Sequence, residues 1–335
     1  MGVIGSGLWG THHAHAFKTL PQTSLAAVCD LDAERVQAFA QTHGAAKAYT
    51  DFRELLADPA IDAVSVATPD FAHAAIIGEA IAANKHVLSE KPLATTVAEA
   101  ERLNDAAAQS GLVCMIDFAN RVNPAFAAAK ASIAGGEIGA PQHIAARLSN
   151  TTFVPLEMLS WADRSSALWF LGSHVVDLLR FLLDDEVRRV YAIARKGILA
   201  SRGVDTDDFH IAVLEFQRGT VVSMENSWLL SPDNPSVVDF AMRIVGADGQ
   251  IDVEPSHSGA VRKLTGDGLK FGDLLGVTPA AGDRLGGFLY EAIARFPDAV
   301  LHGAPPLATF HDGLVTTRIL AAIEQSAQAG AAIDL

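Results

Sequence analysis

The chain opens with Met1-Gly2-Val3-Ile4-Gly5-Ser6-Gly7-Leu8-Trp9-Gly10, a short apolar run that turns through glycines. Gly5, Gly7 and Gly10 have the G-x-G-x-x-G spacing. In that motif the first glycine permits a tight turn, the second lets the backbone approach a pyrophosphate, and the third lets helix and strand pack closely. We predict a strand, a phosphate-binding turn and a helix whose free N–H groups favour an anion.

A second apolar run covers residues 25–30 and ends in Asp30. This acid lies about 20 residues beyond the last glycine, where the motif expects a carboxylate on the adenosine ribose. Glycines also mark ordinary turns, and a surface aspartate after a strand is the alternative interpretation. The two features together predict a dinucleotide site.

Composition limits the class of protein. A chain of 335 residues with 50% hydrophobic residues suggests two globular domains. Its net charge of −14 argues against nucleic acid or an anionic membrane as a partner. The sequence shows no apolar run near the ~20 residues of a membrane span and no signal peptide before the glycine loop, so a cytoplasmic location is the default expectation.

Cysteine and histidine give no metal-ligand pattern. Cys29 and Cys114 lie in apolar runs and are expected as buried free thiols. The spacing of His12, His13 and His15 does not put all three on one helix face. Solvated or capping histidines are expected there, and no metal.

Strands and helices alternate over residues 1–118, which implies a parallel sheet with helices on both faces. In such sheets ligands bind beyond the carboxyl ends of the strands. We expect strands after the first at 25–30, 62–67, 86–89 and 112–116, and helices at 11–20, 33–42, 51–57, 72–83 and 96–109. The loops 5–10, 30–32, 68–73 and 90–92 then share the ligand-binding edge.

The pattern changes after Phe118, where strands follow in succession, so residues 119–335 are expected to form an α+β domain with a large, mainly antiparallel open sheet. The prediction leaves open whether the last helix packs against this domain or against the first one. Strands are expected at 143–148, 189–195, 209–216, 220–229, 239–245, 251–254 and 260–264, and helices at 123–134, 168–183, 284–295 and 310–327.

Glu90-Lys91-Pro92 follows a predicted strand at the ligand edge. A lysine there can act as general acid or base if burial or a nearby positive charge lowers its pKa. Glu90 could steady it by an ion pair. A solvated Glu–Lys pair on a loop is the alternative.

The predicted helix at 168–183 carries a second candidate. Leu171, Val175, Leu178 and Leu182 form an apolar stripe, while His174 and Asp177 are i, i+3 neighbours on another side. The polar pair is either a structural hydrogen-bonded pair or a proton-transfer histidine oriented by its carboxylate.

These residues resemble the Gfo/Idh/MocA oxidoreductases over nearly the whole chain. The resemblance rests on the glycine motif, Thr68-Pro69 with His73, Glu90-Lys91-Pro92, Asn120-Arg121 with Pro124, and Gly172-x-His174-x-x-Asp177. It implies an N-terminal Rossmann domain that binds NAD or NADP, and a C-terminal domain whose sheet commonly makes dimers or tetramers.

The family's roles carry over residue by residue as expectations. Lys91 would position or protonate the substrate oxygen, and His174 would be the acid/base for the hydroxyl. The cofactor-binding residues would be Gly5, Ser6, Gly7, Leu8, Trp9, Gly10, Asp30, Thr68, Pro69, His73, Glu90 and Lys91. The substrate-binding residues would be Lys91, Asn120, Arg121, Trp161, Arg164, Phe170, His174 and Asp177. A surface position or an ion pair for the two arginines, and core packing for Trp161, are the alternatives.

Two positions refine these expectations. Asp30 favours NAD over NADP, because a carboxylate would repel a 2′-phosphate. Many dehydrogenases of the family have Asp four residues before the histidine, where this chain has Phe170. Lys91 then carries more of the acid/base work, the substrate presents an apolar face to Phe170, or the chemistry is not simple alcohol oxidation.

The expected function is transfer of a hydride between nicotinamide and a sugar, polyol or related cyclic alcohol or ketone, with Lys91 and His174 as acid/base residues. One alternative is a redox-neutral lyase or glycosidase that keeps its NAD. Another is a non-catalytic nucleotide-binding regulator, and a third is a Rossmann-like domain that binds no nucleotide.

Overall fold

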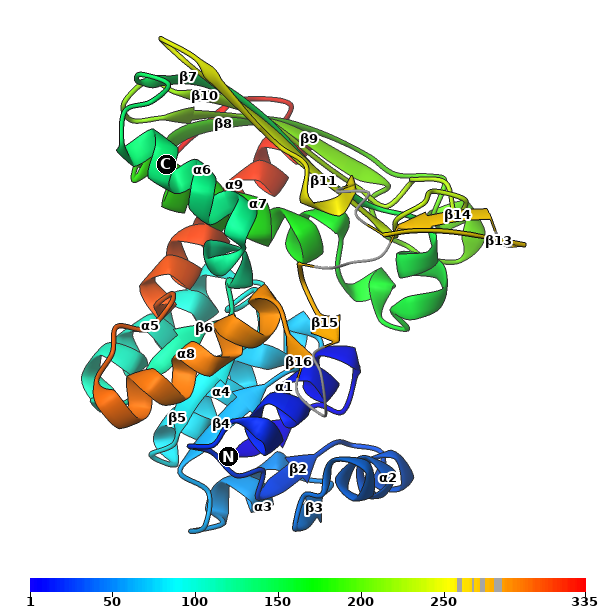
Figure 1. Cartoon of the computed structure of the whole chain (residues 1–335), viewed down its shortest axis with the longest axis vertical. Coiled ribbons are helices and arrows are strands. Elements are labelled where there is room, and N and C mark those ends of the chain that lie inside the picture. Colours follow the sequence, from blue (N-terminus) through cyan, green and yellow to red (C-terminus); the bar gives the residue numbers. More distant parts are fainter. Residues whose placement is uncertain (258–260, 267, 272–274, 280–284) are drawn as a thin grey trace. The chain divides into compact units, whose positions relative to one another are not determined.

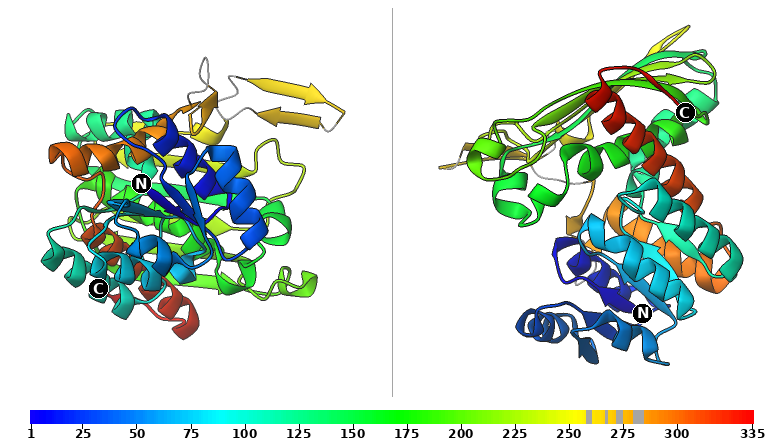
Figure 2. Two further views of the ribbon diagram at one scale, coloured as in Figure 1. Left: turned by 90° about the horizontal axis from the view of Figure 1, so that it is seen from below. Right: turned by 180° about the vertical axis from the view of Figure 1, so that it is seen from behind.

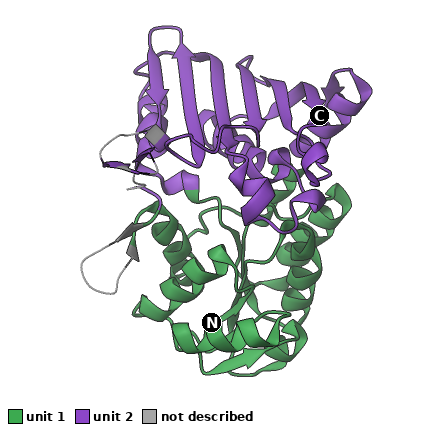
Figure 3. Cartoon of the chain, turned by 90° about the vertical axis from the view of Figure 1, so that its right-hand side faces the viewer, with its two compact units in different colours: residues 1–119, 277–317 green, residues 120–276, 318–335 purple. Residues whose placement is uncertain are grey.

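The computed structural model describes residues 1–257, 261–266, 268–271, 275–279 and 285–335. It divides into two compact units (Figure 3), the first with residues 1–119 and 277–317 and the second with residues 120–276 and 318–335. Residues 277–317 therefore group with the first unit, whereas the sequence-based division assigned all of 119–335 to the second domain.

The first unit contains a six-stranded parallel sheet in the order β3-β2-β1-β4-β5-β6 (Figure 1), the strand order of a Rossmann dinucleotide-binding domain. Its strands are β1 (Gly2–Ile4), β2 (Ala27–Cys29), β3 (Lys47–Tyr49), β4 (Ala63–Val66), β5 (His86–Ser89) and β6 (Cys114–Ile116). Its helices are α1 (Leu8–Thr19), α2 (Ala33–His43), α3 (Phe52–Ala57), α4 (His73–Ala82), α5 (Val97–Ser110) and α8 (Phe288–His302).

Helices cover both faces of this sheet, as the alternation of buried side chains along the strands shows. Val3 packs in one apolar cluster with Phe17 of α1 and Phe296 of α8. Its neighbour Ile4 packs in a second cluster with Ile77 of α4 and Leu103 of α5. Successive strand residues point to opposite faces, so each short strand is buried on both sides.

The second unit contains a seven-stranded sheet in the order β12-β11-β7-β10-β9-β8-β17. Every pair of neighbouring strands is antiparallel except β7 and β10. Its strands are β7 (Pro141–Asn150), β8 (Val187–Arg195), β9 (Phe209–Phe216), β10 (Val221–Ser227), β11 (Val238–Gly246), β12 (Gln250–Val253) and β17 (Ile333–Asp334). A two-stranded ribbon, β13 (Arg262–Thr265) with β14 (Gly268–Phe271), also belongs to this unit.

Helices of the second unit gather on one face of its sheet (Figure 2): α6 (Pro124–Ala134), α7 (Ser173–Leu183) and the last part of α9 (Phe310–Ala329). Burial alternates along β8, β9 and β10, so one face is core and the other is exposed. The predicted open, mainly antiparallel sheet is confirmed.

Several predicted boundaries were wrong. The helix expected at 284–295 is α8, which begins at Phe288 after Gly287 and continues through the buried Pro297 to His302. Two residues of the predicted elements lie outside the described residues: residue 284 of the helix expected at 284–295 and residue 260 of the strand expected at 260–264. The short strands β3, β17, β15 (Thr278–Pro279) and β16 (Leu285–Gly286) were not predicted, because two or three residues carry too little periodicity.

Candidate active site

In the first unit, five parallel strands end at the same level along one edge of the sheet. Strand register aligns Cys29, Ile4, Val66, Ser89 and Ile116. The residues that follow them, Asp30, Gly5, Ala67, Glu90 and Asp117, therefore leave the sheet at the same edge. This places the glycine turn, the candidate ribose acid and Glu90-Lys91 together, as the sequence predicted.

The three motif glycines differ in what a side chain would meet. A Cβ at Gly10 would lie 1.9 Å from the Gly5 carbonyl oxygen, and one at Gly5, where φ is +104°, would lie 2.4 Å from the Ala67 oxygen. A Cβ at Gly7 would meet nothing within 4 Å. Gly5 and Gly10 thus allow close packing, while Gly7 leaves open space at the start of α1, where no acidic side chain or side-chain cap competes for the N–H groups.

Asp30 is held by the same turn. Its Oδ2 accepts hydrogen bonds from Ser6 N at 3.0 Å and from Ser6 Oγ at 2.5 Å, and its Oδ1 accepts from Arg35. Burial alone would raise the pKa of Asp30, but the hydrogen bonds from Arg35 and Ser6 hold it below its ordinary value. An oriented, ionised carboxylate is suited to accept hydrogen bonds from ribose hydroxyls.

The loops after β4 and β5 are joined by His73. This ring is 1% exposed, and its Nδ1 lies 2.7 Å from the Pro92 oxygen while its Nε2 lies 2.8 Å from the Thr68 oxygen. The structure therefore places His73, expected as a cofactor contact, in a buried clamp between two backbone carbonyls. Thr68 and Pro69 themselves are half-buried, and Thr68 Oγ1 has no hydrogen-bond partner within the described residues.

Glu90 and Lys91 are each 6% exposed, which contradicts the alternative of a solvated pair. The Lys91–Pro92 peptide is cis. Burial lowers the pKa of Lys91, and the charge of Glu90 is the largest influence that opposes that shift. A buried amine among carboxyl groups at the ligand edge has the character of a proton-transfer residue.

Sequence reasoning missed three residues beside Lys91. His13 is completely buried, not solvated, and it contacts Ser65 and Glu90, while Asp117 follows β6 next to them. One signal was available: His13 lies three residues after Gly10 and four before Phe17, both on the buried face of α1, and a buried histidine requires polar partners.

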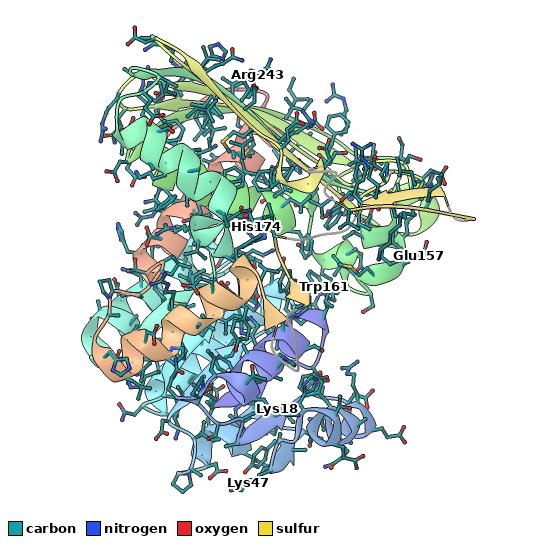
Figure 4. All side chains as sticks on the ribbon, in the orientation of Figure 1. Lys18, Lys47, Glu157, Trp161, His174 and Arg243 are labelled. Carbon is teal, nitrogen blue, oxygen red and sulfur yellow. The ribbon has the colours of Figure 1, made fainter. Side chains whose placement is uncertain are left out.

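In the second unit, His174 lies in the first turn of α7 (Figure 4), directly after a π-helical turn at Leu168–Gly172. A Cβ at Gly172 would lie 2.8 Å from Asn226 Oδ1, so glycine lets this turn approach β10. The residues of the predicted apolar stripe, Leu171, Val175, Leu178 and Leu182, are buried, but burial extends to most other residues of α7. His174 is half-buried.

Asp177 is engaged by Arg121. The guanidinium donates from Nε to Oδ2 at 3.0 Å and from Nη2 to Oδ1 at 2.6 Å, and the side chains are 11% and 2% exposed. This bidentate ion pair connects α7 to the segment before α6. For Arg121 the ion-pair interpretation is therefore the one observed.

Two aromatic rings contact Phe170, the residue four positions before His174. Trp161 lies edge-on with its ring centre 6.1 Å away, and Trp228 lies at 6.0 Å. Trp228 is fully buried, whereas Phe170 and Trp161 are half-buried. The remaining substrate candidates differ: Arg164 is exposed, and Asn120 accepts a hydrogen bond from Asn123 Nδ2 at 3.3 Å.

Two family models match the chain. One, described as an oxidoreductase family with an NAD-binding Rossmann fold, matches residues 1–118, and a GFO/IDH/MocA C-terminal domain matches residues 126–252. The inositol 2-dehydrogenase of Acidothermus cellulolyticus is 32% identical over 80% of this chain and 76% of its own length. The myo-inositol 2-dehydrogenase of Thermotoga maritima is 27% identical, covering 93% and 91%.

The structure is also similar to a solved one. GenD2 from gentamicin A biosynthesis, in complex with NAD, has a TM-score of 0.87 at 26% identity and covers 100% of this chain and 95% of its own. The chain belongs to the GFO/IDH/MocA family of NAD-binding oxidoreductases. The open space at Gly7 and the oriented Asp30 fit that cofactor. Among the described residues, no helix has the length and apolar character needed to cross a membrane.

Replacing Asp30 by asparagine is expected to weaken the preference for NAD over NADP by about tenfold or more. Two like charges about 4 Å apart repel by about 1–4 kcal/mol near a protein surface, and the substitution removes one of them while leaving Arg35 in place. The dissociation constants of both nucleotides, measured by calorimetry, give the ratio. An unchanged ratio would mean that Asp30 does not face the ribose.

Proposed function

We propose that this protein is an NAD-dependent dehydrogenase of a cyclic polyol or sugar, in which Lys91 and His174 are the acid/base residues. The observation that carries the proposal is the buried Lys91 amine, which leaves the sheet at the same edge as the glycine turn and Asp30. The two relatives named above, both inositol 2-dehydrogenases, support the substrate class.

When bound, NAD supplies the hydride-accepting chemistry. Lys91, as an ammonium, donates a hydrogen bond to the substrate oxygen and stabilises the charge that develops on it. His174 takes the hydroxyl proton and returns it in the reverse direction. The helix that carries His174 is held in place by the Arg121–Asp177 pair. Gly7 and the start of α1 hold the pyrophosphate, and Asp30 holds the ribose.

Phe170 and Trp161 are proposed to bind an apolar face of the substrate. Both rings are half-buried, and an aromatic ring stacks well on the C–H face of a pyranose or cyclitol.

A substrate screen tests the proposal. The protein is incubated with NAD and a panel of inositols, pyranoses and anhydrosugars, while the absorbance of reduced nicotinamide and the product mass are followed. We expect reduced cofactor and a product two mass units lighter, in equal amounts. Tight NAD binding without any conversion would contradict the proposal and favour a regulatory protein.

Phe170 also favours a second candidate, a redox-neutral lyase or glycosidase that retains its NAD. His174 here has an aromatic neighbour four residues earlier instead of a carboxylate, which changes the polar surroundings of a simple proton relay. The same screen separates the two, because a lyase would form product of altered mass without net accumulation of reduced nicotinamide.

A homodimer or homotetramer through the outer face of the second unit's sheet is also part of the proposal. Exposed apolar side chains meet across strands there: Tyr191 (42% exposed) pairs with Val213 (39%), and Ile193 (40%) pairs with Ile211 (47%). An apolar patch of this kind is typical of a protein interface. A cytoplasmic location is proposed with it, in line with the two free cysteines.

Replacing Ile211 and Val213 together by aspartate is expected to convert the oligomer to monomers, because four buried charges per dimer would face one another. Light scattering after size exclusion measures the mass. Leu301→Asp, at an apolar residue of α8 that is 54% exposed, is the matched control and should leave the mass unchanged. A monomeric wild type would contradict the proposed interface.

A further inference from the structure

Two carboxyl groups lie side by side in the neighbourhood of Lys91. Glu90 and Asp117 follow Ser89 and Ile116, which are register partners in β5 and β6. They are 6% and 4% exposed. Two neighbouring carboxyl groups in a buried site do not both ionise, because the second charge is repelled by the first. One of them must carry the negative charge and the other a proton.

The hydrogen bonds distinguish the two. Glu90 Oε1 lies 3.1 Å from His13 Nε2, and Glu90 Oε2 accepts from the Lys91 backbone N–H at 3.3 Å. Asp117 Oδ2 is 3.7 Å from the same His13 nitrogen, beyond hydrogen-bonding distance, and its Oδ1 has no partner within the described residues. A buried anion needs donors, so the geometry makes Glu90 the carboxylate.

The direction of the pKa shifts agrees. Burial and the neighbouring charge of Glu90 raise the pKa of Asp117 well above its ordinary value. Burial would also raise the pKa of Glu90, but the hydrogen bond from His13 and the charge of Lys91 keep it lowered.

His13 is itself held in one orientation. Its Nδ1 lies 2.7 Å from Ser65 Oγ, and both side chains are completely buried. When Ser65 donates to Nδ1, the ring hydrogen is on Nε2 and points at Glu90, since the bond made by one ring nitrogen fixes the tautomer at the other. The histidine comes from α1, the helix that begins at the glycine turn.

We propose that His13 is a positioning residue: oriented by Ser65, it makes Glu90, and not Asp117, the anion beside the Lys91 ammonium. The inference deepens the proposed function and rests on it, since it explains how a buried lysine keeps the charge with which it holds the substrate oxygen. Without that anion, burial would drive Lys91 toward the neutral amine.

Titratable side chains from several helices and strands lie around Lys91 and Glu90, and all of them can affect a pH experiment. They are Glu90, Asp117, Asp70 before α4, His73 at its start, and His12 and His13 on α1. The Nε2 atom of His13 lies 3.1 Å from Glu90 Oε1 and 3.7 Å from Asp117 Oδ2.

The test measures the pKa of Lys91 directly in the NAD-saturated protein, by NMR of lysine labelled with ¹³C at Cε. Lys91→Arg identifies the signal. His13→Leu is expected to lower the pKa of Lys91 by about one unit, a tenfold change in its ionisation constant. His13→Gln, whose amide can still donate to Glu90, should restore the wild-type value. Asp117→Asn should leave it unchanged, because the proposal makes Asp117 the protonated, uncharged member of the pair.

Either of two NMR results would overturn the proposal. One is a Lys91 pKa in His13→Leu that equals the wild-type value. The other is a Lys91 pKa that falls in Asp117→Asn by as much as it falls in His13→Leu. A stoichiometric divalent cation in the purified protein, found by elemental analysis, would overturn it too, since the ligand atoms of His13, Glu90 and Asp117 lie within 4.8 Å of one another. If His13→Leu does not fold, Ser65→Ala tests the same shift through the orienting hydroxyl.

Activity gives a second readout. If charged Lys91 is required, activity is lost as pH rises through its pKa, so the alkaline limb of kcat/KM should move to lower pH in His13→Leu and return in His13→Gln. A wild type that converts no polyol or sugar would refute the proposed function, while the NMR measurement would still decide the role of His13.

Discussion

Lys91→Met is expected to lower kcat by about 10²- to 10⁴-fold, the usual contribution of a positioned acid or base. Methionine has nearly the length of lysine and suits a buried site, but it can neither hold an oxyanion nor transfer a proton. Steady-state kinetics with the substrate found in the screen measures the loss. The affinity for NAD, measured by calorimetry, should change much less than kcat.

Lys18→Met is the matched control. Lys18 lies on α1 in the same unit and is exposed (Figure 4), so its replacement should leave kcat unchanged. Circular dichroism of both variants guards against unfolding. A Lys91→Met enzyme that retains more than about a tenth of wild-type kcat would remove Lys91 from the chemistry.

Gly7→Ala and Gly10→Ala are expected to fail in different ways, although each adds one methyl group. A Cβ at Gly7 has no protein atom within 4 Å, and φ is −75°, so the fold should tolerate alanine. The methyl group would fill the space of the pyrophosphate and weaken NAD binding by about tenfold or more, at least 1.4 kcal/mol.

At Gly10 the added Cβ would lie 1.9 Å from the Gly5 carbonyl oxygen, which forces the backbone apart. We expect a loss of about 1–3 kcal/mol or more in the free energy of unfolding, as in overpacked cores. Thermal denaturation and calorimetry with NAD on both variants separate stability from binding. Wild-type affinity for NAD in Gly7→Ala would mean that the pyrophosphate lies elsewhere.

The sheet of the first unit and its ligand edge could be predicted because glycine spacing and the alternation of apolar runs are local signals. Asp30, Glu90 and Lys91 were found from their positions directly after strands, where parallel strands must end together. The α7 stripe was predicted for the same reason, since its period is visible within four turns.

The buried network around Lys91 could not be predicted in this way. His13 lies on helix α1, Ser65 lies in strand β4 and Asp117 follows strand β6, so the network depends on tertiary packing between distant segments. The partner of Asp177 is likewise distant, because Arg121 lies 56 residues earlier in the chain. Charge alone suggested an ion pair for Arg121 but not its partner.

The central claim is that the redox ring of the dinucleotide is bound beside the Lys91 amine. The most direct measurement is the pKa of Lys91, by ¹³C NMR, in the NAD⁺-bound and the NADH-bound protein. The nicotinamide ring carries a positive charge only when oxidised, so we predict a lower pKa of Lys91 with NAD⁺ than with NADH. The same pKa with both forms of the cofactor would contradict the account.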